Sequence, residues 1–112
     1  MATSFNALLA DRLRDPEFAR HHAVETARIA AIDAVINQLD ELREASGLTK
    51  AGLARAIGSE PSVVRRLLSA QAVNPTLATV AEVAAALGMK VTLEPMSKEE
   101  RKRITEPMRA SA

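Results

Sequence analysis

Apolar positions recur at helical spacing along most of the chain. Residues 17–46 contain no Gly and no Pro, and Ile29, Ile32, Ile36 and Leu39 follow one another at steps of three and four. Asp15 and Pro16 suit an N-cap and a first helical position, and Gly47 suits a left-handed C-cap. The pattern therefore predicts one long helix over residues 16–46, preceded by a short amphipathic helix over residues 5–14.

Three shorter helices are predicted downstream from their end signals. Gly58 ends one of them, Ser59 or Glu60 caps the next, and Pro61 suits its first turn because its missing N–H is harmless there. Thr76 caps the third, which Gly88 closes. The expected helices cover residues 49–57, 61–69 and 77–87.

The C-terminal part predicts a strand and then a tail. Met89, Val91 and Leu93 alternate with polar residues, which is typical of a half-buried strand over residues 90–94. A lone strand needs a partner, either from a second chain or from elsewhere in this one. Residues 96–112 are charged and interrupted by Pro, so we expect them to fray.

Composition narrows the possible chemistry. The 112 residues are 47% hydrophobic and 26% charged, with only 2% aromatic and no Cys. Disulfides, thiolate metal sites and Cys nucleophiles are therefore excluded. His21 and His22 are adjacent on a predicted helix with no other His or Cys, so surface histidines are favoured over a metal site. We expect no metal, no cofactor and no catalytic residues, and hence no enzyme.

Charge and hydropathy along the chain bear on partners and location. The formal net charge is +1, so any nucleic-acid function depends on local charge placement. The N-terminus lacks the pattern of a secretory signal, and no apolar stretch is long enough to cross a membrane. We therefore expect a cytoplasmic protein without membrane contact.

Two helices joined at Gly58 have the arrangement of a helix-turn-helix. The small Ala54 suits the close helix crossing, and apolar residues at Leu53, Ile57, Val64 and Leu67 suit its packing. The second helix then turns Ser62, Arg65, Arg66 and Ser69 outward. An ordinary helical hairpin is the alternative, and the exposed arginines favour DNA binding.

Residues 42–93 resemble the phage-repressor type (Xre/Cro-like) helix-turn-helix family. The resemblance rests on "LREASGLTKAGLARAIGSEPSVVRRLL" followed by "NPTLATVAEVAAALG". Within that family, "DPEFA", "RRLLSAQAVNPTLATV" and "GMKVTLEP" are most similar to HigA-type antitoxins. Such antitoxins bind a RelE/HigB-like ribonuclease toxin and repress their own operon.

This resemblance implies a mostly α fold in three parts. Residues 1–32 form an N-terminal helical extension, residues 33–95 a phage-repressor-like helix-turn-helix domain with a short C-terminal strand, and residues 96–112 a charged flexible tail. In the family, the second motif helix lies in the major groove of DNA. The implied DNA-binding residues are Lys50, Ser59, Glu60, Pro61, Ser62, Val63, Arg65, Arg66, Ser69 and Thr76. Among them Arg66 is expected to read guanine and Lys50 to contact phosphate.

Two further surfaces are expected to bind proteins. A homodimer on a palindromic operator needs an interface, for which the candidates are Leu87, Met89, Val91 and Leu93, with the apolar seam of residues 29–39 as a competitor. A possible toxin-binding or partner-binding cluster consists of Phe5, Leu8, Leu9, Leu13, Phe18, Ile29 and Ile32; the same residues could instead fold back on the long helix. The leading interpretation is an antitoxin and repressor. A stand-alone Xre-family regulator and a protein-interaction module that does not bind DNA are the alternatives.

Overall fold

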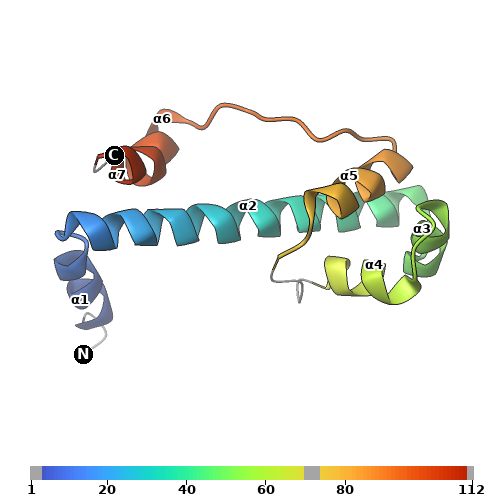
Figure 1. Cartoon of the computed structure of the whole chain (residues 1–112), viewed down its shortest axis with the longest axis horizontal. Helices are drawn as coiled ribbons and strands as arrows, with labels where there is room; N and C mark the ends of the chain where they lie inside the picture. The colour runs from blue at the N-terminus through green and yellow to red at the C-terminus, as the bar shows by residue number, and fades with distance from the viewer. Residues whose placement is uncertain (1–3, 70–73, 111–112) are drawn as a thin grey trace. The chain divides into compact units, whose positions relative to one another are not determined.

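The computed structural model describes residues 4–69 and 74–110, and every regular element in these ranges is helical (Figure 1). The elements are α1 (Ser4–Arg12), α2 (Pro16–Ser46), α3 (Lys50–Ala56), α4 (Pro61–Leu68), α5 (Leu77–Ala86), α6 (Lys98–Glu100), the π-helical turn η1 (Arg101–Thr105) and α7 (Glu106–Arg109). None of the helices described is both long and apolar enough to cross a membrane. The predicted mostly α class is confirmed.

The chain divides into two compact units. Unit 1 combines Met1–Ala31 with Glu94–Ala112, and unit 2 is Ile32–Leu93. The long helix α2 contributes its first half to unit 1 and its second half to unit 2. The helix-turn-helix therefore lies entirely within unit 2.

Helix α2 begins and ends where local chemistry predicts. The Asp15 carboxylate accepts a hydrogen bond from the Glu17 N–H at 3.0 Å, which satisfies one of the free donors of the first turn. At the other end Gly47 has φ 80°, a conformation that costs glycine little. The predicted long helix is confirmed.

The core of unit 2 is small and aliphatic. Leu53, Val64 and Val83 are the largest fully buried side chains, one from each of α3, α4 and α5. Ile36 and Leu39 of α2 belong to the same cluster, and Ala54 is completely buried. Three short helices thus pack on one end of a long one without any aromatic side chain.

The predicted strand over residues 90–94 is wrong for the single chain. In the described ranges no residue adopts strand structure, and residues 89–97 have no regular secondary structure. All of their side chains are exposed, and Leu93 is 98% exposed. A strand needs a neighbour for its backbone hydrogen bonds, and alternation of side chains alone supplies none.

The predicted flexible tail is helical over most of its length. The Ser97 hydroxyl accepts from the Glu100 N–H at 3.1 Å while the Glu100 carboxylate accepts from the Ser97 N–H at 3.0 Å, a reciprocal capping box that starts α6. Ile104 is only 5% exposed. The cap and one buried apolar residue therefore order a segment that its charge had suggested would fray.

Candidate nucleic-acid interface

The turn between α3 and α4 is a closed hydrogen-bonded cap. Gly58 has φ 66°, its N–H donates to the Arg55 carbonyl at 3.2 Å, and the Ser59 N–H donates to the Ala54 carbonyl at 2.9 Å. These two bonds form a Schellman motif, which ends α3 and reverses the chain. Pro61 then opens α4, with φ already suited to a helix. The geometry confirms the predicted helix-turn-helix.

The start of α3 is also fixed by a side-chain cap. The Thr49 hydroxyl accepts from the Gly52 N–H at 2.9 Å. A Cβ at Gly52 would lie 3.2 Å from that hydroxyl oxygen, so the missing side chain lets the cap close tightly. Lys50, the first residue of α3, is thereby held next to the turn that leads from α2.

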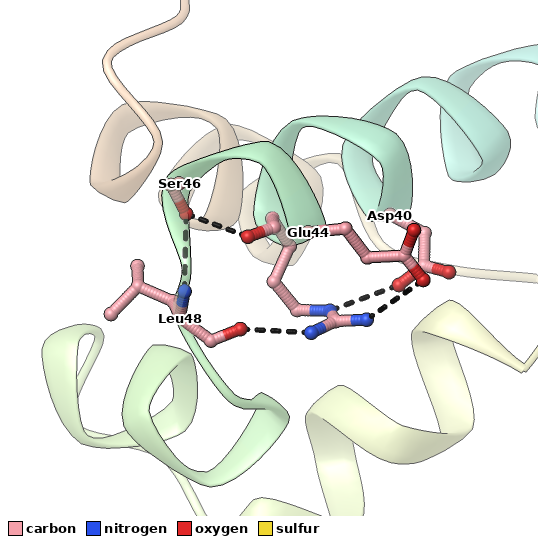
Figure 2. Close-up of polar contacts among 5 residues, drawn as sticks. Asp40, Glu44, Ser46 and Leu48 are labelled. Atoms are coloured by element: carbon pink, nitrogen blue, oxygen red, sulfur yellow. Dashed lines mark hydrogen bonds and ion pairs between the residues drawn. The ribbon is translucent and has the colours of Figure 1, made fainter.

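Arg43 joins the end of α2 to this turn (Figure 2). Its guanidinium donates from Nε to the Asp40 carboxylate at 3.0 Å and from Nη1 to the Leu48 carbonyl at 2.8 Å. It also lies 3.6 Å from the Glu44 carboxylate, and its side chain is only 13% exposed. Arg43 is not among the residues predicted from the sequence, although its spacing of three residues from Asp40 on a helix is a signal of such a pair.

Helix α4 buries one face and exposes the other. Val64, Leu67 and Leu68 are buried, whereas the outward side is exposed at Ser62, Val63, Arg65, Arg66 and Ser69. Within the described ranges, the guanidinium groups of Arg65 and Arg66 form no ion pair or hydrogen bond. Two cations without a described partner are therefore presented to solvent on one short helix.

The other residues expected at this surface come from the starts of α3, α4 and α5 and from the turn before α4. Glu60 and Thr76 are exposed, and Lys50, Ser59 and Pro61 are half-buried. The Thr76 hydroxyl accepts from the Thr79 N–H at 3.1 Å and so caps α5. Arg55 on α3 is a further exposed cation that the sequence analysis did not select, because residue type alone does not separate it from other surface arginines.

The candidate dimer residues divide into two groups. Leu87 is half-buried and packs against the core of unit 2. Met89 and Val91 are 48% and 49% exposed, and Leu93 is almost fully exposed. These three side chains therefore remain exposed to solvent, and none of them belongs to the core cluster of unit 2.

The candidate partner cluster is also divided. Phe5, Leu8 and Ile29 are 72%, 64% and 54% exposed, and Leu13 is 38% exposed. Leu9 is half-buried, as is Phe18, whose ring lies 5.8 Å from the Arg12 guanidinium carbon. Ile32 packs against the core of unit 2. Four members of the cluster thus remain as exposed apolar side chains in unit 1.

In the described part of the chain, no group of three or more His, Asp or Glu side chains is arranged to hold a metal ion. His21 and His22 are both exposed, and the ring of His22 stacks on Phe18 with centroids 6.2 Å apart. Unit 2 instead presents exposed cations and hydroxyl groups near the ends of its short helices. Such groups suit contacts to a polyanion.

Comparison with known proteins supports this geometry. A family model described as a helix-turn-helix domain matches residues 37–95, more than half of the chain. Comparisons with curated proteins and with solved structures give no match. The matched description does not extend to HigA-type antitoxins. Helix-turn-helix domains typically bind DNA and are not enzymes. The chain belongs to the helix-turn-helix domain family.

Proposed function

We propose that the protein is a sequence-specific DNA-binding repressor that inserts α4 into the major groove. The observation that carries the proposal is the pair of exposed guanidinium groups on α4, just after the turn, with no acidic partner among the described residues. An arginine guanidinium matches the two acceptors of guanine in the major groove. The proposal therefore assigns sequence reading to α4.

Each residue at this surface has a distinct role in the proposal. Arg66 forks onto a guanine, and Arg65 contacts phosphate or a second base. Lys50 and the N–H groups at the start of α5 hold phosphates, while Val63, which is 41% exposed, contacts a thymine methyl group. One such domain buries little surface, so a dimer on a palindromic operator supplies the affinity.

The test compares two variants on DNA. A binding site is first selected from random duplexes by the full-length protein. Arg66→Ala should then lose about 1–3 kcal/mol on the selected site and little on random DNA, because it removes a base contact. Lys50→Ala should weaken both kinds of DNA similarly and flatten the dependence of affinity on salt, because it removes a phosphate contact.

Arg109→Ala is the matched control, since Arg109 is exposed in unit 1 and lies outside the helix-turn-helix. It should bind both DNAs like the parent. Equal binding by the parent, Arg66→Ala and Lys50→Ala would refute the assignment of α4 to the groove. Absence of DNA binding by the parent would leave a protein-interaction module as the function.

The exposed apolar side chains of unit 1 favour a second role, that of an antitoxin. Phe5 and Leu8 lie one helical turn apart on α1 and are 72% and 64% exposed, and adjacent exposed apolar side chains of this kind suit a protein interface. We infer that they bind a RelE/HigB-like toxin, in line with the resemblance to HigA-type antitoxins.

The test of this role is coexpression with the neighbouring reading frame. If that frame encodes a small basic toxin, the parent should restore growth, and Phe5→Ser with Leu8→Ser should not. Val63→Ser provides a control with an exposed apolar residue in unit 2. Absence of such a frame, or rescue by both variants alike, would leave a stand-alone regulator as the function.

A further inference from the structure

In residues 89–94, apolar and polar side chains alternate in an order that can match a second, antiparallel copy of the same segment. Met89, Val91 and Leu93 occupy the odd positions, and Lys90, Thr92 and Glu94 the even ones. The segment forms no backbone ladder with any residue that the structure describes, and it is drawn in Figure 1 as an open trace between α5 and α6. The Met89 N–H donates to the Ala84 carbonyl, whereas the backbone donors and acceptors of residues 90–94 have no backbone partner among the described residues and are therefore available to another strand.

We propose that this segment pairs, antiparallel, with the same segment of a second copy of the chain, around a two-fold axis through Thr92. In this register Lys90 lies opposite Glu94 of the partner subunit, and the pair occurs twice. Val91 likewise lies opposite Leu93 of the partner subunit, on the other face. The proposal deepens the proposed function, because it supplies the two-fold symmetry that a palindromic operator requires.

Other registers leave charges unmatched. A two-fold axis perpendicular to a two-stranded ribbon relates each residue to the same residue of the partner on the same face. Directly opposed residues also share a face, whereas neighbours along a strand do not. The axis must therefore pass between two copies of one residue. An axis at Val91 puts Lys90 opposite Thr92, and an axis at Lys90 or at Glu94 puts like charges together. An axis at Leu93 puts Lys90 opposite Met96 and Glu94 opposite Thr92, so neither charge is matched. Only the axis at Thr92 matches opposite charges and apolar side chains together.

Pro95 is consistent with this register. It has no N–H, so it is tolerated in a ribbon only where that N–H would point away from the partner. In an antiparallel ribbon, hydrogen-bonded and non-hydrogen-bonded residues alternate along each strand. If Pro95 is a non-hydrogen-bonded residue, then Lys90, Thr92 and Glu94 are the hydrogen-bonded ones. Val91 and Leu93 then form the closer, non-hydrogen-bonded pairs, in which apolar side chains touch best.

Burial within unit 2 disfavours the competing seam on α2. Ile36 and Leu39 are 2% and 4% exposed because they pack in the core of their own chain. Ile29 and Val35 remain exposed, but they no longer form a continuous seam. Met89, Val91 and Leu93 are 48%, 49% and 98% exposed and do not belong to that core, so a second copy is best accommodated there.

The test exchanges charges and measures dimerisation of the full chain by analytical ultracentrifugation. Lys90→Glu and Glu94→Lys each place like charges opposite one another twice, so each should weaken the dimer about tenfold. An equimolar mixture of the two single variants should form a heterodimer about as strongly as the parent forms its homodimer, since both opposite-charge pairs return. The double variant should also regain the parent affinity. Lys102→Glu, at an exposed position in η1, is the control and should dimerise like the parent.

Hydrogen exchange gives a second readout of register. In the dimer the N–H groups of Lys90, Thr92 and Glu94 should exchange slowly, and those of Val91 and Leu93 rapidly. A monomeric parent, single variants that dimerise like the parent, or protection of the odd positions would overturn the proposal. None of these measurements uses DNA, so the outcome for Arg66→Ala on DNA remains an independent test of the proposed function.

Discussion

The arginines of unit 2 differ in exposure, and this difference distinguishes a structural role from a ligand-binding one. Arg43 donates to the Asp40 carboxylate and the Leu48 carbonyl and is 13% exposed, whereas Arg65 and Arg66 are exposed and donate to no described residue. A buried guanidinium that satisfies a backbone carbonyl is part of the fold. An exposed guanidinium without partners is available to a ligand. The same residue type thus stabilises one turn and serves a surface next to it.

Arg43→Met should lower the stability of unit 2 while leaving its DNA contacts in place. The variant keeps the apolar stem but leaves the Leu48 carbonyl and the Asp40 carboxylate without their donor, at a cost of about 1–3 kcal/mol in the free energy of unfolding. Urea unfolding followed by circular dichroism measures this cost. The salt dependence of DNA binding at temperatures where the variant is folded should match that of the parent.

Arg28→Met is the matched control for that experiment. Arg28 pairs with Glu25 on the exposed surface of α2, where its side chain is 46% exposed, so its loss should cost less than about 1 kcal/mol. Equal losses from the two variants would show that the contacts of Arg43 contribute no more than a surface ion pair.

At the level of single residues, local chemistry was read correctly from the sequence. Gly47, Gly58 and Gly88 all have positive φ at the ends of helices, and Thr76 caps the helix that follows it. These signals depend only on near neighbours along the chain. The burial of Arg43 depends on how α2 meets the turn before α3, which no local pattern contains.

At the scale of elements, the C-terminal helices depend on a cap that titrates. Two hydrogen bonds from Ser97 lower the pKa of Glu100 below its usual value of 4.5. The bond from the backbone N–H has the larger effect, and the bond from the hydroxyl has the smaller one. The folded form therefore favours the charged carboxylate. This contribution to stability is present above about pH 4.5 and is lost as the pH falls through the lowered pKa.

We expect residues 98–109 to lose helix as the pH falls below about 4.5 and through the lowered pKa of Glu100, before α3, α4 and α5 do. Backbone chemical shifts measured along the titration report each helix separately. Glu100→Gln keeps an acceptor for the Ser97 N–H and removes the charge, so it should abolish this transition. Glu99→Gln is the control and should retain it; loss of the transition in both variants would point to general charge repulsion.

The helices of unit 2 were predicted from the sequence, whereas the structures of residues 90–94 and 98–109 were not. The helices of unit 2 were placed because periodicity and end signals agree there. Residues 90–94 have the alternation of a strand, but a ladder needs a second strand, which alternation cannot provide. In residues 98–109 the capping box was present in the sequence as Ser97 and Glu100, and the high charge of the segment concealed it.

At the scale of the whole molecule, the place of the charged side chains says more about a polyanion partner than the net charge does. A formal net charge of +1 does not indicate a polyanion partner, yet Arg65 and Arg66 lie without described partners on one short helix. The family match over residues 37–95 confirms the helix-turn-helix that the sequence predicted. The candidate contact residues on this helix follow from the helical spacing of α4.

The end of α5 has a consequence for the length of an operator. The Gly88 N–H donates to the Ala85 carbonyl at 3.0 Å and the Met89 N–H donates to the Ala84 carbonyl at 2.8 Å, so the point and direction at which the chain leaves α5 are set inside unit 2. In a dimer joined through the residues that follow, the distance between the two copies of α4 is a property of the polypeptide. We therefore expect the proposed dimer to prefer operators with one fixed spacing between the two half-sites.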